Sequence, residues 1–565
     1  MRSTRRWAWV ALVLGLLGFG FMAGMTAEFV AAPSKVIRRA VASLRPPKPA
    51  TVVANPDVDS IFIHFKRETI PLPITRYGRG GGVTVVDNTA VAATLDGKLF
   101  MAGSAQSVQP LDIAVPDYAF DAYRALADDP AYKDYHFEYW AYRYFDILAF
   151  DHDGQERLAL SFVKYEADRA CFHTVVAMLD IPSTAAELAT FSARADDWTT
   201  LFVTEPCLPL KKTGSAIEIQ IGGGRMAYDG KGKLVLGSGD FHFDGIFADG
   251  PPIAPDPAYD YGKVIEIDLA SGAHRQIARG LRNMQGMAFD GKGQLWAVEH
   301  GLRGGDELNL IREGKDYGWP SESLGTLYNQ LPIPNTLSFG RHDVHEPPVY
   351  AFVPSVAISS LDLIEGFNSA WDGDILMGTL KDESLYRFRI VDNRVMFAER
   401  IPIGTRIRAA RQLDADRLVL FTDNNELIFL TENPNGAATA FLTAYLEQDT
   451  LPAHTRDRLK ANMDTCLTCH SLDPDVNDFA PSLAAIVGAP RGKRPFPNYS
   501  PTLRAEDGAW TKESLAAFLS NPASVAPGTT MPDPGIRDPE EIDAVVAFLA
   551  AMGSPMNLAP ETATP

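Results

Sequence analysis

The sequence predicts a mainly β protein, with a β-propeller followed by a smaller all-α domain. The first observation is a phrase that recurs in the middle of the chain, in which an Asp-Gly turn joins two apolar strands. It occurs at 226–236 and 287–297, with weaker copies at 95–101, 371–377 and 416–420. Such strand–turn–strand repeats are typical of propeller blades, which close into a ring. The second observation is a Cys-x-x-Cys-His run near the C-terminus, followed by a helical pattern over 539–549.

The length and composition set the expected domain organisation. The chain has 565 residues, of which 46% are hydrophobic, enough for more than one domain. We expect a membrane anchor or signal segment (1–30), a linker (31–56), the propeller (57–430), a linker (431–454), the all-α domain (455–553) and a tail (554–565). The net charge of −19 argues against nucleic-acid binding, which requires clustered Lys and Arg. An acidic surface suits a basic redox partner instead.

The N-terminus has the pattern of a membrane-spanning helix. Arg2, Arg5 and Arg6 precede an apolar run over 7–25, which is close to the length that spans a bilayer. The residues that follow, Met25-Thr26-Ala27, make a poor signal-peptidase site. We therefore expect an uncleaved anchor, with a cleaved signal segment as the alternative.

Cys466, Cys469 and His470 form the attachment signature of a c-type haem, in which both thiols bond the porphyrin and the histidine ligates its iron. A thioredoxin-like dithiol would require a βαβ context. A zinc site would require a second Cys/His pair, and no cysteine follows Cys469. The motif therefore predicts covalent haem c.

A haem iron of an electron carrier needs a second axial ligand, and Met531 is the favoured candidate. It stands in a Pro-rich and Gly-rich loop over 527–534, and a His/Met pair is the arrangement of cytochromes c. Met463 is too close to the attachment helix, while Met552 and Met556 lie in or beyond the last helix. The segment 451–552 resembles a small class I cytochrome c. This resemblance implies haem attachment outside the cytoplasm and thus a periplasmic protein.

Two other features leave alternatives open. Cys171 and Cys207 can form a disulfide outside the cytoplasm, and two buried free thiols are the alternative. The segment 118–150 is dense in aromatic residues. It is interpreted as an insertion packed on the propeller rather than as a sugar-stacking platform, because aromatic side chains dominate packing wherever they occur.

Three phrases in the propeller segment, at 280–289, 299–311 and 316–320, carry a family resemblance. They resemble the glucose/sorbosone dehydrogenase family, six-bladed propellers that hold pyrroloquinoline quinone, and the resemblance extends over about 83–430. The residues that it assigns are Arg282 and Asn283 on the quinone, the Gly301 and Leu302 carbonyls on calcium, Asp306 beside the metal and cofactor, Lys381 as a clamp, and the paired Arg406 and Arg408.

The chemistry of these residue types agrees with the resemblance. Pyrroloquinoline quinone carries three carboxylates, and arginine binds carboxylates through two parallel hydrogen bonds. Arg406 and Arg408 are at alternate positions and would share one face of a strand. Calcium prefers oxygen ligands and would polarise the quinone carbonyl.

The sequence departs from the family at the catalytic base. The family has a histidine where this chain has Ile221, and isoleucine cannot accept a proton. The partner acid is retained as Asp240. His242, on the same face as Asp240 if the strand continues, and His300, inside the calcium-loop motif, are the candidates for a replacement base.

These features together predict a periplasmic, membrane-anchored oxidoreductase. It would oxidise a sugar or alcohol through pyrroloquinoline quinone and pass electrons to its own haem, and then to a downstream respiratory electron acceptor. The alternative is a non-catalytic propeller binding module that carries an electron-transfer cytochrome c. Ile221 favours this alternative, whereas the complete set of carboxylate-binding cations favours the enzyme.

Overall fold

The computed structural model describes residues 53–54, 58–61, 63–73, 78–105, 107–334, 336–368, 370–432, 441–442, 445–448, 451–467, 469–472 and 480–552. Contacts divide the chain into two units, Met1–Asn55 with Glu68–Phe429, and Pro56–Arg67 with Leu430–Pro565. Within the described ranges, no helix combines the length and apolar character that a membrane span requires. The predicted anchor at 7–25 lies outside the described residues.

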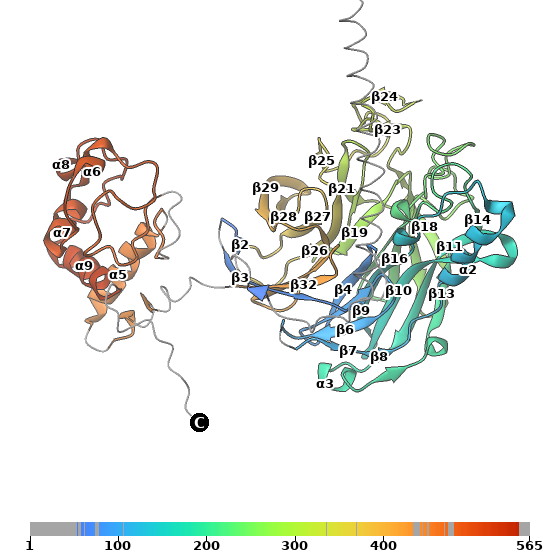
Figure 1. The fold of residues 1–565 in the computed structure, drawn as a ribbon, viewed down its shortest axis with the longest axis horizontal. Coiled ribbons are helices and arrows are strands. Elements are labelled where there is room, and N and C mark those ends of the chain that lie inside the picture. The colour runs from blue at the N-terminus through green and yellow to red at the C-terminus, as the bar shows by residue number, and fades with distance from the viewer. Residues whose placement is uncertain are drawn as a thin grey trace, which may run out of the picture. The chain divides into compact units, whose positions relative to one another are not determined.

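The first unit is a propeller of six blades, each a sheet of four or more strands in the described part of the chain (Figure 1). The first five blades are built from consecutive strands. Blade one contains β4 (Gly81–Val86), β5 (Thr89–Thr94), β6 (Leu99–Ala102) and β7 (Gln109–Pro110), and blade two contains β9 (Tyr144–His152), β10 (Gln155–Glu166), β11 (Cys171–Asp180) and β13 (Thr199–Val203). Blade three contains β15 (Gly223–Tyr228), β16 (Lys233–Ser238), β17 (Lys263–Asp268) and β18 (His274–Arg279), and blade four contains β19 (Met284–Phe289), β20 (Leu295–Glu299), β21 (Asp306–Ile311) and β25 (Tyr350–Phe352). Blade five contains β26 (Ile358–Leu363), β27 (Ile375–Thr379), β28 (Ser384–Val391) and β29 (Arg394–Pro402).

The sixth blade joins the two ends of the propeller segment. It takes β30 (Ile407–Gln412), β31 (Arg417–Thr422) and β32 (Glu426–Glu432) from the end, and β3 (His64–Pro71) with the short β1 (Val53–Ala54) and β2 (Val58–Asp59) from the beginning. The first strands of successive blades adjoin in the order β4, β9, β15, β19, β26, β30 and back to β4. This closed ring leaves no open edge between blades, which would otherwise be a site for aggregation.

The recurring Asp-Gly phrase is confirmed as the turn inside a blade. In blades three and four it joins the first strand to the second, and Asp229 and Asp290 hold the turn with their carboxylates. Asp229 Oδ1 accepts from the backbone of Lys231 (2.7 Å), and Asp290 Oδ1 from that of Gln294 (2.8 Å). The copy at 95–101 differs, because it joins the second and third strands of its blade.

Apolar side chains fill the interfaces between neighbouring blades. One core cluster joins the first and second blades and includes Val91, Ile147 and Leu160. Similar clusters occur at the other interfaces, with Val264 and Met287 between blades three and four. Because the apolar side chains pack between blades, the polar residues at the ends of the inner strands are not needed for the core and can form a binding site.

Insertions between strands complete the propeller unit. The aromatic-rich segment forms α2 (Phe120–Ala125), η1 (Leu126–Asp128), η2 (Pro130–Tyr132) and η3 (Tyr139–Ala141). Its Tyr123 and Tyr142 are buried and stacked, with centroids 4.7 Å apart, so the interpretation as a packed insertion is confirmed. The smaller elements are β8 (Asp112–Ile113), η4 (Ala167–Arg169), α3 (Ala185–Leu188), β12 (Ser192–Ala193), η5 (Ala195–Asp197), β14 (Leu208–Pro209), η6 (Ile219–Ile221), β22 (Lys315–Asp316), β23 (Glu322–Ser323) and β24 (Ser338–Phe339).

Cys171 and Cys207 form a disulfide, with their Cα atoms 5.6 Å apart. The bond joins the start of β11 to the residue before β14, which pairs with β11. The question that the sequence left open is thereby resolved in favour of pairing.

The part of the second unit that follows β32 is helical over the residues described, whereas its segment 56–67 contributes to the strands β2 and β3. It contains α5 (Ala453–Cys466), α6 (Pro501–Ala505), α7 (Lys512–Ser520), α8 (Pro522–Val525) and α9 (Pro539–Met552). Its core takes Leu459 and Met463 from α5, Phe518 from α7, and Val545 and Phe548 from α9. The predicted last helix is thus confirmed as α9, whose buried side chains recur at helical spacing.

Candidate functional site

The candidate site of the propeller lies where the first strands of the blades begin. Arg143 precedes β9, Arg225 is in β15, Arg282 and Asn283 precede β19, and Arg408 is in β30. Because these strands adjoin around the ring, residues far apart in the sequence meet at one end of it. The site is therefore a product of the closed fold and not of any single segment.

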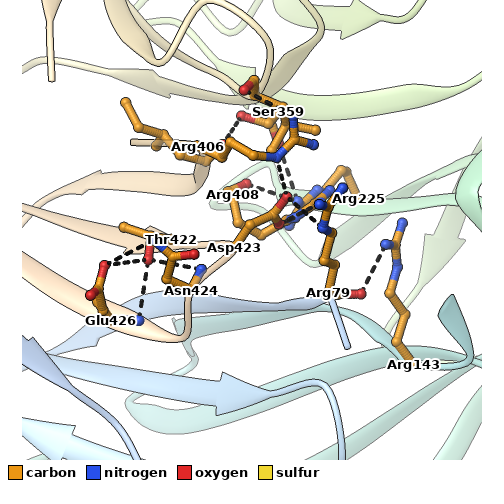
Figure 2. Close-up of polar contacts among 12 residues, drawn as sticks. Arg79, Arg143, Arg225, Ser359, Arg406, Arg408, Thr422, Asp423, Asn424 and Glu426 are labelled. Carbon is orange, nitrogen blue, oxygen red and sulfur yellow. Dashed lines mark hydrogen bonds and ion pairs between the residues drawn. The ribbon is translucent and has the colours of Figure 1, made fainter. Parts of the chain in front are cut away.

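Five arginines gather at this end, from blades one, two, three and six (Figure 2). This arginine cluster consists of Arg79, Arg143, Arg225, Arg406 and Arg408. Two carboxylates accompany it, those of Asp146 and Asp423. Three of these arginines, Arg143, Arg225 and Arg408, are buried, as are the two carboxylates, whereas Arg79 and Arg406 are partly exposed.

Asp423 anchors the paired arginines of the sixth blade. Arg406 Nε lies 2.8 Å from Asp423 Oδ2, and Arg408 NH2 lies 2.6 Å from Oδ1. Arg406 and Arg408 therefore share one partner, although Arg406 precedes β30 and only Arg408 lies in the strand. Burial alone would raise the pKa of Asp423, but the adjacent Arg408 and Arg406 lower it below its usual value. The carboxylate therefore stays ionised and holds both guanidinium groups in place.

Arg225 is a strut between blades. Its NH1 donates to Asp146 Oδ1 (3.0 Å), and its NH2 donates to the carbonyls of Ser359 and Arg408 (3.1 Å each). These partners come from blades two, five and six, and only 3% of Arg225 is exposed. Burial lowers its pKa, and Asp146 opposes this effect. With both terminal nitrogens engaged, Arg225 stabilises the ring.

Asn283 fixes the protonation of His300. Its Oδ1 accepts from the backbone N–H of Gly223 (3.1 Å), and its Nδ2 donates to the carbonyl of Gln220 (3.0 Å), so the amide orientation is set. The same Nδ2 lies 3.3 Å from His300 Nδ1, which must then accept. The neutral imidazole consequently carries its proton on Nε2, a buried atom with no hydrogen-bond partner. Burial lowers the pKa of His300 to about 4, so it is neutral at physiological pH.

Arg282 controls the second predicted base, His242. Its NH2 lies 3.0 Å from His242 Nε2, while its NH1 donates to the carbonyls of Gly301 (2.8 Å) and His300 (3.1 Å). Since a guanidinium only donates, His242 Nε2 accepts from it. Burial, with the charge of Arg282 next to it, lowers the pKa of His242 to about 2.

The strand that was expected to place Asp240 and His242 on one face ends earlier, because β16 ends at Ser238. His242 instead lies in a turn with a φ of 61°, and its backbone N–H donates to Asp240 Oδ1 (2.9 Å). Trp319 Nε1 donates to Asp240 Oδ2 (2.6 Å). Burial, followed by the nearby Asp244, raises the pKa of Asp240 to about 7. Asp240 therefore positions His242 through its backbone.

The residues of the predicted calcium loop are close together and already hydrogen-bonded. Both oxygens of Asp306 are acceptors, including for the backbone N–H groups of Gly301 (3.0 Å) and Ala357 (2.6 Å). The carbonyl of Gly301 accepts from Arg282, and Leu302 is buried against Trp319. Lys381 Nζ donates to the carbonyl of Ser355 (3.0 Å), whose hydroxyl also binds Asp306. This loop is thus rigid, and a cation there would compete with Arg282 for Gly301.

Ile221, at the position of the family base, ends η6 next to this site. Only 9% of it is exposed, and its carbonyl accepts from the backbone of Phe241 (3.3 Å). It offers no titratable group there.

The helical unit brings together the haem-attachment residues. Cys466 is the last residue of α5, and the backbone N–H groups of Cys469 (3.2 Å) and His470 (3.0 Å) donate to its carbonyl. His470 Nδ1 lies 2.7 Å from the carbonyl of Pro481, to which it donates its proton. This bond leaves Nε2 as the free lone pair, as an iron ligand requires. Cys466 is half-buried, and Cys469 is exposed.

Met531 lies in the loop between α8 and α9 and is packed, partly buried, against the helical core. Cys466 is packed against the same core. Met463 is fully buried inside α5, as a core residue is, and Met556 lies outside the described residues.

Sequence reasoning missed Arg79, Arg143 and the roles of Arg225 and Asp423. Arg225 follows a Gly-Gly-Gly run that was considered only for the position of the base. Asp423 follows a strand in a polar Asp-Asn-Asn turn, which reads as an ordinary surface turn. Nothing near Arg143 in the sequence marks it, since its neighbours in the site come from other blades.

The structure combines a six-bladed propeller that has a cationic site with a helical unit that contains a haem-attachment motif. The family model for glucose/sorbosone dehydrogenase matches residues 164–430. The propeller is therefore similar to this family over those residues, and through its helical unit the chain belongs to the cytochromes c.

Individual relatives agree with both assignments. Aldose sugar dehydrogenase YliI of Escherichia coli is 31% identical over 235 residues, which cover 38% of this chain and 60% of that protein. Cytochrome c2 of Rhodomicrobium vannielii is 35% identical over 86 residues, 15% of this chain and 69% of that protein. The structure of the soluble aldose sugar dehydrogenase from Escherichia coli in its apo form is similar in fold. Its TM-score is 0.51 at 23% identity, over 68% of this chain and 100% of that one.

The chain spans only part of several of these proteins. It covers 60% of the sugar dehydrogenase and 49% of a cytochrome c homologue from Rickettsia bellii.

Proposed function

We propose that the protein is a quinohaemoprotein dehydrogenase. The propeller would oxidise a sugar or alcohol with pyrroloquinoline quinone, and the helical unit would carry the electrons away through covalent haem c. The observation that carries the proposal is the arginine cluster, in which five arginines, three of them buried, outnumber two buried carboxylates at one end of the ring. The similarity of both units to redox families supports it.

The residues of the propeller site fit a ligand that is rich in carboxylate and carbonyl oxygens. Arg282 Nε and His300 Nε2 are buried donors that have no hydrogen-bond partner among the described residues. Arg406, Arg408 and Lys381 would hold carboxylates, while Arg282 and Asn283 would face the quinone. What pyrroloquinoline quinone would supply when bound is a two-electron acceptor.

We assign the base to His242 ahead of His300. A single contact, from Arg282, engages His242 Nε2, so movement of one guanidinium would free its lone pair. His300 has its lone pair on Nδ1 held by the Asn283 amide, which three other contacts fix, and its Nε2–H is a donor. Asp240 would keep His242 in its turn. In a calcium-loaded site, the carbonyls of Gly301 and Leu302 would be ligands. Because Arg282 donates to the same Gly301 carbonyl, a cation there would displace its guanidinium.

In the helical unit, Cys466 and Cys469 would bond the haem, and His470 and Met531 would ligate its iron. The haem would supply a one-electron carrier between the propeller and a downstream respiratory acceptor. The covalent haem and the disulfide both suit an oxidising compartment, the periplasm. The apolar run at 7–25 would anchor the protein to the membrane, which carbonate extraction of membranes would test.

The test uses the purified full chain loaded with calcium and pyrroloquinoline quinone. Aldoses and alcohols are screened for reduction of the haem absorption bands. Arg408→Gln should abolish the reduction, whereas Arg411→Gln, on the same strand but bonded to the Leu361 carbonyl, should not. His242→Ala should stop turnover, and His300→Ala should only slow it. Turnover that survives His242→Ala would remove it as the base.

Ile221 and the engaged histidines favour a second candidate, a non-catalytic propeller that binds the quinone and carries a cytochrome. Binding of the cofactor without any substrate-dependent haem reduction would support this candidate. Failure of the cofactor to bind would overturn both.

A further inference from the structure

Arg143 differs from the rest of the arginine cluster in having no carboxylate. Arg225 pairs with Asp146, while Arg406 and Arg408 pair with Asp423, and Arg79 lies 3.9 Å from Asp423. Among the described residues, no carboxylate oxygen lies within ion-pair distance of the Arg143 guanidinium, although only 6% of this residue is exposed. A buried guanidinium without a counter-charge is costly, because desolvation is not repaid.

The contacts that Arg143 does make hold it in place without neutralising it. Its NH1 donates to the carbonyl of Arg79 (3.1 Å), as Figure 2 shows, and its guanidinium lies over the ring of Phe145 (5.9 Å to the centroid). Gly80 leaves room for its stem, since a Cβ there would be 2.4 Å from Arg143 Cδ. Burial lowers the pKa of Arg143 well below its usual value and Arg408 lowers it further, while Asp423, which makes no ion pair with Arg143, opposes the shift only in part.

We infer that Arg143 is a carboxylate-binding residue of the propeller site, and that its counter-charge is supplied by the ligand. The guanidinium is preorganised by Arg79, Phe145 and Gly80, and its remaining N–H groups are suited to a planar anion. The carboxylate has two possible sources, the quinone cofactor or an acidic sugar. The identity of the two possible ligands rests on the proposed function. That the ligand is an anion follows from Arg143 and its surroundings alone.

The first test needs no activity. The full chain and its Arg143→Gln variant are compared by thermal unfolding without ligand. If Arg143 awaits an anion, Arg143→Gln should raise the melting temperature of the propeller by about 2 °C or more, because it removes an uncompensated buried charge. The control is Arg387→Gln, since Arg387 is also fully buried but lies 2.6 Å from Asp374 and 2.7 Å from Glu399. That variant should lower the melting temperature.

The second test measures binding. Titration with pyrroloquinoline quinone should give a Kd at least about 10-fold weaker for Arg143→Gln, if the cofactor supplies the carboxylate, and Arg143→Lys should restore part of the affinity. If the substrate supplies it, the Kd for the cofactor stays the same. The variant then loses the preference for sugar acids over neutral sugars, measured as the ratio of their kcat/KM values.

The failures are distinguishable. If the unchanged chain binds no pyrroloquinoline quinone, the proposed cofactor is wrong. The role of Arg143 is then tested with citrate, a simple tricarboxylate, by the rise in melting temperature that citrate causes. Citrate should then stabilise the unchanged chain more than Arg143→Gln. A lowered melting temperature of the ligand-free variant, with citrate, cofactor and sugar-acid responses unchanged, would show that Arg143 is structural and overturn the inference.

Discussion

The propeller and the helical unit contain two candidate redox sites that are built in opposite ways. The haem-attachment residues come from one run of five positions, at the end of one helix, and only Met531 is distant. The propeller site takes its arginines from four different blades, and each is placed by the closure of the ring. One site is therefore local in the sequence, and the other exists only when the whole propeller has folded.

The two sites also differ in how their charges are held. In the propeller, Asp146 and Asp423 fix buried guanidinium groups, so the same ion pairs both neutralise the charges and position the side chains of the site. In the helical unit, a single bond from His470 to the Pro481 carbonyl orients the ligand, and the surroundings are apolar. Substitutions should accordingly cost stability in the propeller and cofactor attachment in the helical unit.

The largest expected effect is on haem attachment. Replacing both Cys466 and Cys469 by Ala should remove covalent haem completely, because no thiol remains in the helical unit to bond the porphyrin. The measurement is haem staining of the denatured chain on a gel. Unfolding of the propeller should be unaffected, since its own cysteines form a separate disulfide. Covalent haem that survives in the double variant would contradict the assignment.

The difference between the sites explains what the sequence could predict. Haem attachment was readable from adjacent residues, and the repeated Asp-Gly turns indicated the blades because both are local patterns. His242 was misplaced because the end of β16 at Ser238 is set by the turn that Asp240 holds. Arg143 was missed because its meaning lies in the absence of a nearby carboxylate among the described residues. Such an absence becomes visible only when distant strands are brought together.

The next largest effect should follow from Asp423→Asn. This change leaves Arg406 and Arg408 without their carboxylate, and breaking a buried pair of this kind costs about 4 kcal/mol in the free energy of unfolding. Because the pKa of Asp423 is lowered in the folded state, its contribution is present at neutral pH and is lost as the pH falls through that pKa.

The measurement is urea unfolding followed by the β-sheet signal in circular dichroism, with Asp382→Asn as the control. Asp382 pairs with Arg400, whose side chain is 48% exposed, so its loss should cost at most about 1 kcal/mol. Equal costs for the two variants would show that Asp423 does not hold a buried charge network.

Removal of the disulfide should lower the free energy of unfolding of the propeller but not that of the helical unit, and the loss should be smaller than that caused by Asp423→Asn. Cys171 and Cys207 are 36 positions apart, and opening a loop of this length should lower the free energy of unfolding of the propeller by about 3 kcal/mol. The Cys171→Ser, Cys207→Ser double variant tests this by urea unfolding. The helical unit should keep its stability, and a loss shared by both units would contradict their independence.

The smallest effect concerns the pH response of His300. Its unfolded pKa is near 6.5 and its folded pKa is about 4, so below neutral pH the unfolded chain binds a proton that the folded protein does not. Stability is therefore complete above pH 6.5 and falls as the pH decreases toward 4, by about 2 kcal/mol between about pH 7 and pH 5. His300→Gln should remove this loss, because the amide oxygen of Gln can still accept from Asn283 without titrating.

The difference in unfolding free energy between these two pH values, measured for both proteins, isolates this contribution from any change in packing. The helical unit should behave in the same direction at His470, because burial also lowers the pKa of that imidazole. There, however, haem ligation would hold Nε2 deprotonated by bonding to iron, whereas His300 resists protonation through burial and through the charges of Arg282 and Arg408. If the pH dependence is the same in His300→Gln, then His300 does not cause the loss of stability, and its pKa in the folded protein is not lowered. Solvent would then reach the imidazole and bind its Nε2 proton.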